Sequence, residues 1–215
     1  MIKVAAGVLG AGAVAAGGAL AYKGLIKSPT HSIKDLLATK NPEKRLISKS
    51  NDGSSAEWKA AWKLYLTAYK NNNQNPFFLT VAKPTTIDDN QSAPSEFMSK
   101  CESLIMEQVS NEKDDKYKGV LQYCTRSTLV KDLVMESGRS ILQDSDDWSG
   151  SWNSYKSANT DKGDKQDTWK LEDWNTKKSG STVSGDLQKK CKEKLGSKVG
   201  MQVDDYSNIV KWCSK

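Results

Sequence analysis

Apolar and aromatic residues recur at helical spacing in the first half of the chain. The first such face consists of Trp58, Trp62, Tyr65, Leu66 and Tyr69. This i, i+4, i+7 pattern predicts an α-helix that buries one side. Ser54 and Glu57 have the spacing of a capping box, so we expect the helix to begin there.

Two further helices are predicted after the first. The apolar positions of the second are Phe97, Cys101, Leu104, Ile105 and Val109, preceded by Pro94, a residue suited to a first helical turn. The third is marked by Tyr117, Val120, Leu121 and Cys124. Asp114 and Asp115 are its expected N-terminal caps, and Asp204 and Asp205 have the same role in a similar segment near the end. The pattern therefore predicts a mainly α-helical protein.

A short alternating run follows the first helix. An Asn-rich turn, "KNNNQN" at 70–75, leads into "PFFLTV" at 76–81, and "DTWKLEDW" at 167–174 alternates in the same way. Alternation of this kind is typical of strands. The sequence thus allows one short β element at each of these places.

The chain contains an internal repeat. Trp58, Trp62, Tyr65 and Cys101 recur, each displaced by 90 positions, as Trp148, Trp152, Tyr155 and Cys191. The same displacement matches Leu79 and Val81 with Trp169 and Leu171, and a displacement of 89 carries Tyr123 and Cys124 onto Trp212 and Cys213. Upstream, "SIKDLL" at 32–37 matches "LVKDLV" at 129–134. We therefore predict two tandem helical units, at 30–124 and 127–213.

The first 27 residues have a different composition. An uncharged Gly- and Ala-rich stretch runs from Val4 to Tyr22, and as a helix it would reach roughly 28 Å, about the thickness of a hydrocarbon core. Ala19-Leu20-Ala21 also fits a signal-peptidase site. Two interpretations are favoured, a membrane anchor that is retained and a signal segment that is removed, and both place the rest of the chain outside the cytoplasmic membrane. A buried Gly/Ala helix of a soluble domain is the third, less favoured alternative.

Charge and composition narrow the classes of function. The chain carries a net charge of +6 with a pI near 9.0, but acidic and basic residues are interspersed throughout. This pattern is typical of a solvated surface and makes nucleic acid an unlikely partner. The single histidine, His31, disfavours catalytic triads and His-rich metal sites. We expect no catalytic residues, no cofactor and no metal.

The four cysteines are the strongest chemical signal. Within each predicted unit the two cysteines are 23 or 22 positions apart on apolar helix faces, which suits a disulfide between two helices. The repeat favours Cys101 with Cys124 and Cys191 with Cys213. The alternative is four buried free thiols in a reducing compartment.

Three other features have weaker functional interpretations. The Trp/Tyr face of the first helix suits a glycan or peptide platform, but its spacing favours a core. Trp169 and Trp174 lie in a polar stretch and are the better candidates for an exposed contact, although a local mini-core is the default interpretation for them as well. "NTDKGDKQD" at 159–167 lacks the ligand order of a calcium loop, so we expect a solvated loop or caps.

Taken together, these motifs resemble the paralogous families of uncharacterised proteins found in haemotropic mycoplasmas, wall-less bacteria that live on red blood cells. The resemblance rests on the N-terminal "VAAGVLGAGAVAAGGALAY", on "SIKDLL" and "EWKAAWKLY", and on the closing "WC". It implies a surface or membrane-associated protein involved in host contact or antigenic variation, and it brings no catalytic or ligand residues.

The sequence thus predicts a non-enzymatic surface protein held in the cell membrane by one N-terminal anchor, with its C-terminal region outside. A secreted form is the alternative for location. The expected partner is a host surface protein or glycan. The alternative function is that of a basic protein that captures polyanions, either nucleic acid or an anionic glycan.

Overall fold

The computed structural model describes residues 29–49, 52–71, 74–80, 86–199 and 203–215. Within these residues the chain forms nine α-helices, one 3₁₀ turn and four strands of two or three residues. The expectation of a mainly helical protein is therefore confirmed.

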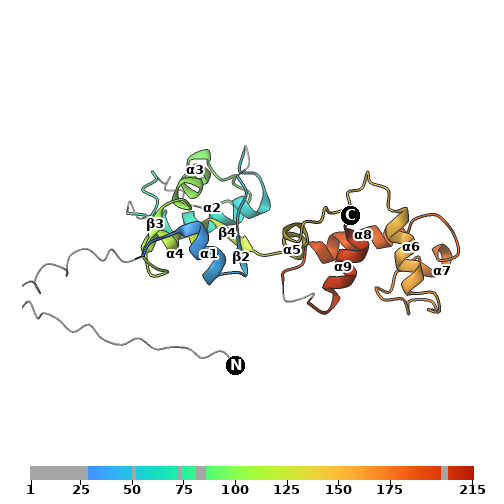
Figure 1. Cartoon of the computed structure of the whole chain (residues 1–215). Helices are drawn as coiled ribbons and strands as arrows, with labels where there is room; N and C mark the ends of the chain where they lie inside the picture. The colour runs from blue at the N-terminus through green and yellow to red at the C-terminus, as the bar shows by residue number, and fades with distance from the viewer. Residues whose placement is uncertain (1–28, 50–51, 72–73, 81–85, 200–202) are drawn as a thin grey trace, which may run out of the picture.

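The elements up to residue 127 surround one hydrophobic core (Figure 1). Its helices are α1 (Ile33–Lys40), α2 (Ala56–Tyr69), α3 (Ser95–Leu104) and α4 (Asp115–Tyr123). Its strands are β1 (His31–Ser32), β2 (Lys44–Leu46), β3 (Gln108–Val109) and β4 (Thr125–Ser127). β1 pairs antiparallel with β3, and β2 with β4. We call this group of buried residues, Ile33 to Cys124, the first core.

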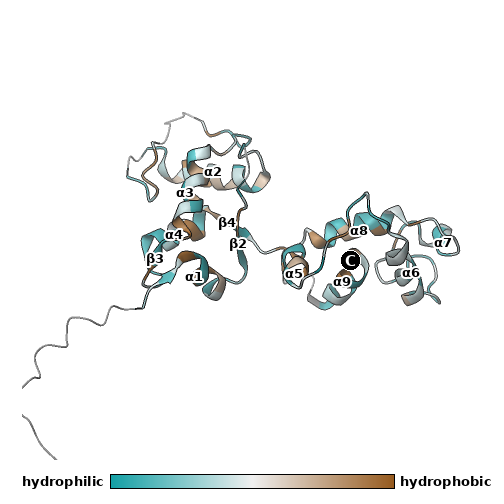
Figure 2. Ribbon diagram, turned by 45° about the horizontal axis from the view of Figure 1, so that its top comes forward, coloured by the Kyte–Doolittle hydropathy of each residue, from teal (hydrophilic) through white to brown (hydrophobic). Residues whose placement is uncertain are grey.

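The remaining elements surround a separate core. They are α5 (Val130–Glu136), α6 (Ser149–Ala158), α7 (Trp174–Lys177), α8 (Gly185–Leu195), the 3₁₀ turn Val203–Asp205 and α9 (Tyr206–Cys213). We call the group of buried residues from Val130 to Cys213 the second core. Figure 2 shows apolar and polar positions alternating along α1, α4, α5 and α8, as expected for helices that bury one side.

The chain passes once between the two cores, from β4 into α5 (Figures 1 and 2). The guanidinium of Arg45 in β2 makes two hydrogen bonds to the carboxylate of Glu136 in α5, at 2.8 and 3.0 Å. Arg126 in β4 binds Asp132 in α5 in the same two-pronged way. Thr128 also donates its amide to the Glu43 carbonyl. The connection is therefore fixed by charged hydrogen bonds, which are stronger than neutral ones.

The start of α2 differs from the prediction. The N-cap is Ser55, whose hydroxyl accepts a hydrogen bond from the Trp58 amide. Ser54, the expected cap, instead donates its amide to the side chain of Asp52. A turn that contains Gly53, with φ at +62°, lies immediately before α2. The helix therefore begins one residue later than predicted.

The second predicted helix is shorter than expected. α3 ends at Leu104, and Val109 belongs to β3, where it pairs with His31. Val109 is buried nonetheless, with 2% of its surface exposed. Its apolar character reflects packing under β1, which periodicity within one segment does not distinguish from a helical face.

The predicted β elements at 76–81 and 167–174 are not strands. The described residues 74–80 and 167–173 form turns and irregular chain, and residue 81 lies outside the described part. Phe78 and Lys170 have positive φ, at 54° and 53°, which is incompatible with a strand. The alternation arises because these turns place successive side chains inside and outside.

The predicted matches of Leu79 with Trp169 and of Val81 with Leu171 are also wrong. Trp169 was matched with Leu79, but Trp169 packs on Tyr155 as Phe77 packs on Tyr65. Leu79 instead has its counterpart in Leu171, as its hydrogen bonding below shows. The second copy has two more residues before this turn and two fewer after it, and an ungapped comparison missed both changes.

The predicted anchor or signal segment, residues 1–27, lies outside the described residues. Among the helices of the described part, none is long and apolar enough to cross a membrane, and the longest, α2, has 14 residues.

Candidate binding site

Each core contains one disulfide between two helices. Cys101 in α3 is joined to Cys124 at the end of α4, with their Cα atoms 5.5 Å apart. Cys191 in α8 is joined to Cys213 in α9 at the same Cα separation. This is the pairing that the repeat favoured. All four cysteines are buried, with at most 3% of their surface exposed.

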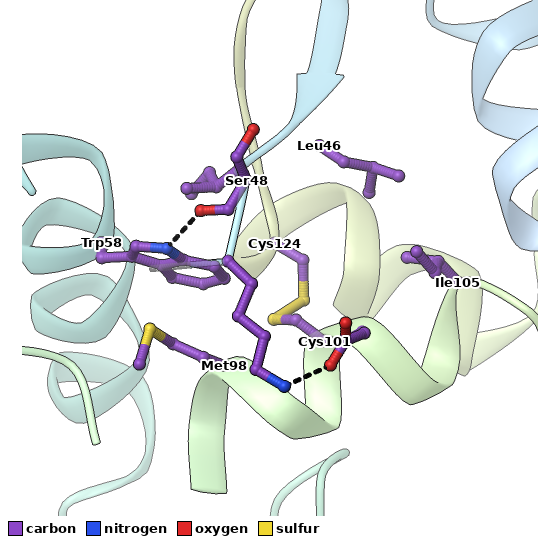
Figure 3. Close-up of a pocket in the computed structure, with 10 residues that line it drawn as sticks. Leu46, Ser48, Trp58, Met98, Cys101, Ile105 and Cys124 are labelled. Carbon is purple, nitrogen blue, oxygen red and sulfur yellow. Dashed lines mark hydrogen bonds and ion pairs between the residues drawn. A yellow bond between two sulfur atoms is a disulfide. The ribbon is translucent and has the colours of Figure 1, made fainter. Parts of the chain in front are cut away.

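A small groove lies beside the first disulfide (Figure 3). Its floor is apolar and includes Met98 and the disulfide of Cys101, and Trp58 forms one wall. The indole nitrogen of Trp58 donates a 2.8 Å hydrogen bond to the carbonyl of Ser48, which fixes the ring. The groove has a volume of about 210 Å³.

The second disulfide has a groove of the same construction. Trp148 forms one wall, and its indole nitrogen donates a 2.9 Å hydrogen bond to the carbonyl of Gln143. Leu142, Cys191 and Leu195 contribute apolar surface. This groove is larger, with a volume of about 620 Å³.

An ion pair spans each groove, with opposite polarity. Lys49, in the segment after β2, binds Glu102 on α3 at 2.5 Å. In the second groove Asp144, in the segment between α5 and α6, binds Lys192 on α8 at 2.8 Å. The sequence analysis missed these four residues. A comparison of charge between the two copies would have revealed them, because each member of the pair is exchanged for its opposite.

The predicted Trp/Tyr face is core, as its spacing favoured. Trp58, Trp62 and Tyr65 are at most 5% exposed, and Tyr65 packs against Phe97 and Tyr123. The same face of α6 is buried in the second core. These rings hold the structure together and offer little surface to a ligand.

The hydroxyl of Tyr65 donates to the side-chain oxygen of Asn75 inside the first core. The same oxygen accepts the Leu79 amide at 3.0 Å, and the amide nitrogen of Asn75 donates to the Leu79 carbonyl at 2.8 Å. Both polar atoms of the Asn75 side chain are therefore hydrogen-bonded although only 5% of the residue is exposed. Burial raises the pKa of the Tyr65 hydroxyl, so it remains a hydrogen-bond donor.

In the second core an aspartate takes the place of that asparagine. Tyr155 donates to Asp167, whose same oxygen accepts the Leu171 amide at 3.0 Å. The other carboxylate oxygen of Asp167 is buried without a hydrogen-bond partner in the described structure. Burial, and then the bond to Asp167, raise the pKa of the Tyr155 hydroxyl.

Trp169 and Trp174, the candidates for an exposed contact, are buried at 6% and 1% exposure. Trp169 donates its indole nitrogen to Asp205 at 2.8 Å, and Lys194 lies 5.0 Å from the Trp169 ring. The local core that the sequence favoured as the default for these two rings is therefore confirmed, and lysine stems and aspartates form its outer wall.

Asp205 occupies the N-cap position of α9 but makes no capping hydrogen bond. It accepts instead from Lys194, Trp169 and Asn208. Burial alone would raise the pKa of its carboxyl, but these hydrogen bonds, led by the one from Lys194, hold it below its ordinary value. In contrast, Asp114 does cap α4, as expected, by accepting the Lys116 amide.

The segment 159–167 has a structural role. The side chain of Asn159 accepts both the amide and the hydroxyl of Thr168 and donates to the Tyr155 carbonyl, so it closes a loop over α6. Among the residues that the structure describes, no cluster of three or more His, Cys, Asp or Glu could hold a metal ion.

Comparisons with protein-family models, with curated proteins and with solved structures find no match for this chain.

Proposed function

We propose that this chain is a non-enzymatic surface protein, held in the cell membrane by residues 1–27, whose two helical units face the outside and bind a host protein or glycan. The observation that carries the proposal is the presence of two buried disulfides, one in each core. Disulfides persist in oxidising compartments and are rare in the cytosol.

Shared contacts support the interpretation of the two cores as tandem copies of one unit. The Ile33 amide donates to the Glu107 carbonyl, and the Val130 amide donates to the Ser197 carbonyl. The wall tryptophan, the core tyrosine and the disulfide also recur at matching places. A surface protein built this way presents two related but chemically different faces to its partners.

The charge distribution favours this proposal over capture of polyanions. Residues 30–124 contain 13 Lys and Arg against 12 Asp and Glu, and residues 127–213 contain 14 of each. Neither unit carries the charge excess that drives phosphate or sulfate binding. Half of the net positive charge lies in Lys3, Lys23 and Lys27, beside the apolar segment.

A non-reducing peptide map of the protein from its native cells tests the proposal. Intact cells are first treated with a membrane-impermeant amine label, and the peptides are then sorted by label, cysteine pairing and mature N-terminus. We expect Cys101 joined to Cys124, Cys191 joined to Cys213, labelled surface lysines and an intact N-terminal peptide. A mature chain that begins after Ala21 would instead indicate secretion.

Four free thiols together with unlabelled lysines would contradict an external location. Cells that are permeabilised before labelling provide the control, because they show which lysines react when access is not limited. Salt-sensitive retention of the purified chain on heparin, lost between 50 and 200 mM salt in roughly the manner of a polyanion binder, would favour the alternative function.

A further inference from the structure

A cavity in the first unit, distinct from the groove beside the disulfide, lies between the turn at residues 74–78 and helix α4. Its volume of about 880 Å³ is within the range of small-molecule sites. Tyr69 and Phe78 supply aromatic surface above the buried ring of Tyr123, and Gln74 and Gln122 carry amide groups on the lining. Aromatic walls with a few polar groups are the usual composition of a ligand site.

Helix α4 lies close to the turn because of a glycine. A Cβ atom at Gly119 would come within 3.1 Å of the Phe77 ring and 3.5 Å of Pro76. The base of the cavity is therefore formed by backbone and by the ring of Tyr123, which packs edge-on against Tyr69 at 5.8 Å. These rings are held by the core and do not need a ligand to order them.

Phe78 is the unusual residue of this cavity. Phe78 is 86% exposed, and its backbone is in the left-handed region with φ at 54°. Because Phe78 lines the cavity, its exposed ring offers a flat apolar face on which a ligand in the cavity can stack. The second unit shows that the turn does not require it, because Lys170 has the same place and φ 53°. A lysine there satisfies the fold, so the turn leaves the ring of Phe78 available to a ligand.

The charges around the cavity cancel. Asp115 pairs with Lys118 at 3.1 Å, and Lys116 pairs with Glu107 outside the cavity. Asp114 is occupied in capping α4 through the Lys116 amide. With two acidic and two basic side chains on its lining, the cavity has no net charge to attract an ion. Its chemistry fits an uncharged ligand with one apolar face and several hydroxyl groups.

We propose that this cavity binds a neutral pyranose sugar, whose C–H face stacks on Phe78 and whose hydroxyls bond the amide and carboxylate groups of the rim. The inference deepens the proposed function by naming its ligand class, and it rests on that function for the setting, an outward face of a surface protein. The binding itself is a property of the purified chain.

Saturation-transfer NMR of the full chain tests this directly. The chain is kept in a detergent without a sugar head group, and the probes are the methyl glycosides of galactose, glucose, mannose and N-acetylglucosamine. We expect at least one of them to receive saturation, strongest at the C–H protons of one ring face. Phe78→Lys, the residue that the second unit carries at this place, should weaken that binding about tenfold or more.

Two variants serve as controls. Met106→Lys exchanges another exposed apolar residue, 66% exposed and away from the cavity, and should leave affinity unchanged. Phe78→Tyr keeps an aromatic ring and should retain binding. An unchanged peptide map of the cysteines shows that each variant is folded.

The proposal is overturned if none of the neutral sugars binds, or if Phe78→Lys binds as well as the natural chain. It is also overturned if the chain binds only sialic acid or heparin, or only a proline-rich peptide. If no sugar binds, the proposed surface location is unaffected. Free thiols in native cells would contradict the surface location, but they would not affect the sugar binding measured in solution.

Discussion

The two cores differ most where they meet solvent and least where they are buried. Both contain a wall tryptophan bonded to a backbone carbonyl of the preceding loop, a buried tyrosine and a disulfide. Outside, Phe78 is exchanged for Lys170, and the ion pair over the groove is reversed. The buried contacts are shared because each is needed to close a small core, whereas exposed positions are free to vary with function.

The interior also shows compensation between positions. In the first core Phe97 packs against both Trp62 and Tyr65. The matching position of the second core is Leu187, and there Trp174 packs against Trp152 and Tyr155 instead. A core is filled to a fixed density, so a ring lost from α8 is replaced by one from α7.

Removing one disulfide at a time should cause the largest difference in stability between the two cores. Cys101→Ser with Cys124→Ser should destabilise the first core by about 3 kcal/mol, and the Cys191/Cys213 pair should do the same to the second. Five of the seven tryptophans lie in the second core, so its unfolding dominates the fluorescence. Thermal melts followed by calorimetry and by fluorescence measure the two separately. One transition that shifts equally in both variants would show that the cores unfold together.

Exchanging the buried amide and carboxylate should have the next largest effect. Asp167→Asn should stabilise the second core by about 1 kcal/mol, because the new amide nitrogen can donate to the Leu171 carbonyl as Asn75 does to Leu79. Asn75→Asp should destabilise the first core by about 1–3 kcal/mol by leaving a buried oxygen without a partner. Urea unfolding at pH 7 measures both changes. Destabilisation by both variants would contradict the equivalence of the two sites.

Acidification should affect the second core through Asp205. Its folded pKa lies below the ordinary value of 3.8, so the unfolded chain takes up more protons as the pH falls through that region. The contribution to stability is fully present above about pH 5 and is lost progressively below it. Urea midpoints from pH 6 to pH 3 should fall less steeply for Asp205→Asn than for the natural chain. Parallel curves would show that Asp205 does not contribute to the acid sensitivity.

Reversing the ion pair over the first groove should have the smallest effect. Glu102→Lys alone sets two lysines against each other and should cost up to about 1 kcal/mol. Adding Lys49→Glu recreates the polarity of Asp144 with Lys192 and should restore the original stability. A double-mutant cycle at low salt measures the coupling. A double variant that is no better than the single one would show that the first groove depends on its own polarity.

The mainly helical content was predictable because the buried residues of the helices follow the helical period. Positions such as Trp58, Trp62 and Tyr65 lie on one face of α2 as expected. The helix boundaries were harder to predict, because Ser54 and Ser55 are chemically identical caps and the turn at Gly53 decides between them. The cavity at Phe78 could not be predicted, because its walls come from two segments at least 36 positions apart.

The sequence by itself determined the helical class, the cysteine pairing that the repeat favoured and the burial of the Trp/Tyr face. These properties depend on residue spacing, which a linear chain records directly. Only the tertiary structure decided that Asp205 bonds Lys194 and that the two grooves carry opposite ion pairs. These depend on contacts between distant segments, and no local pattern contains the geometry that brings such segments together.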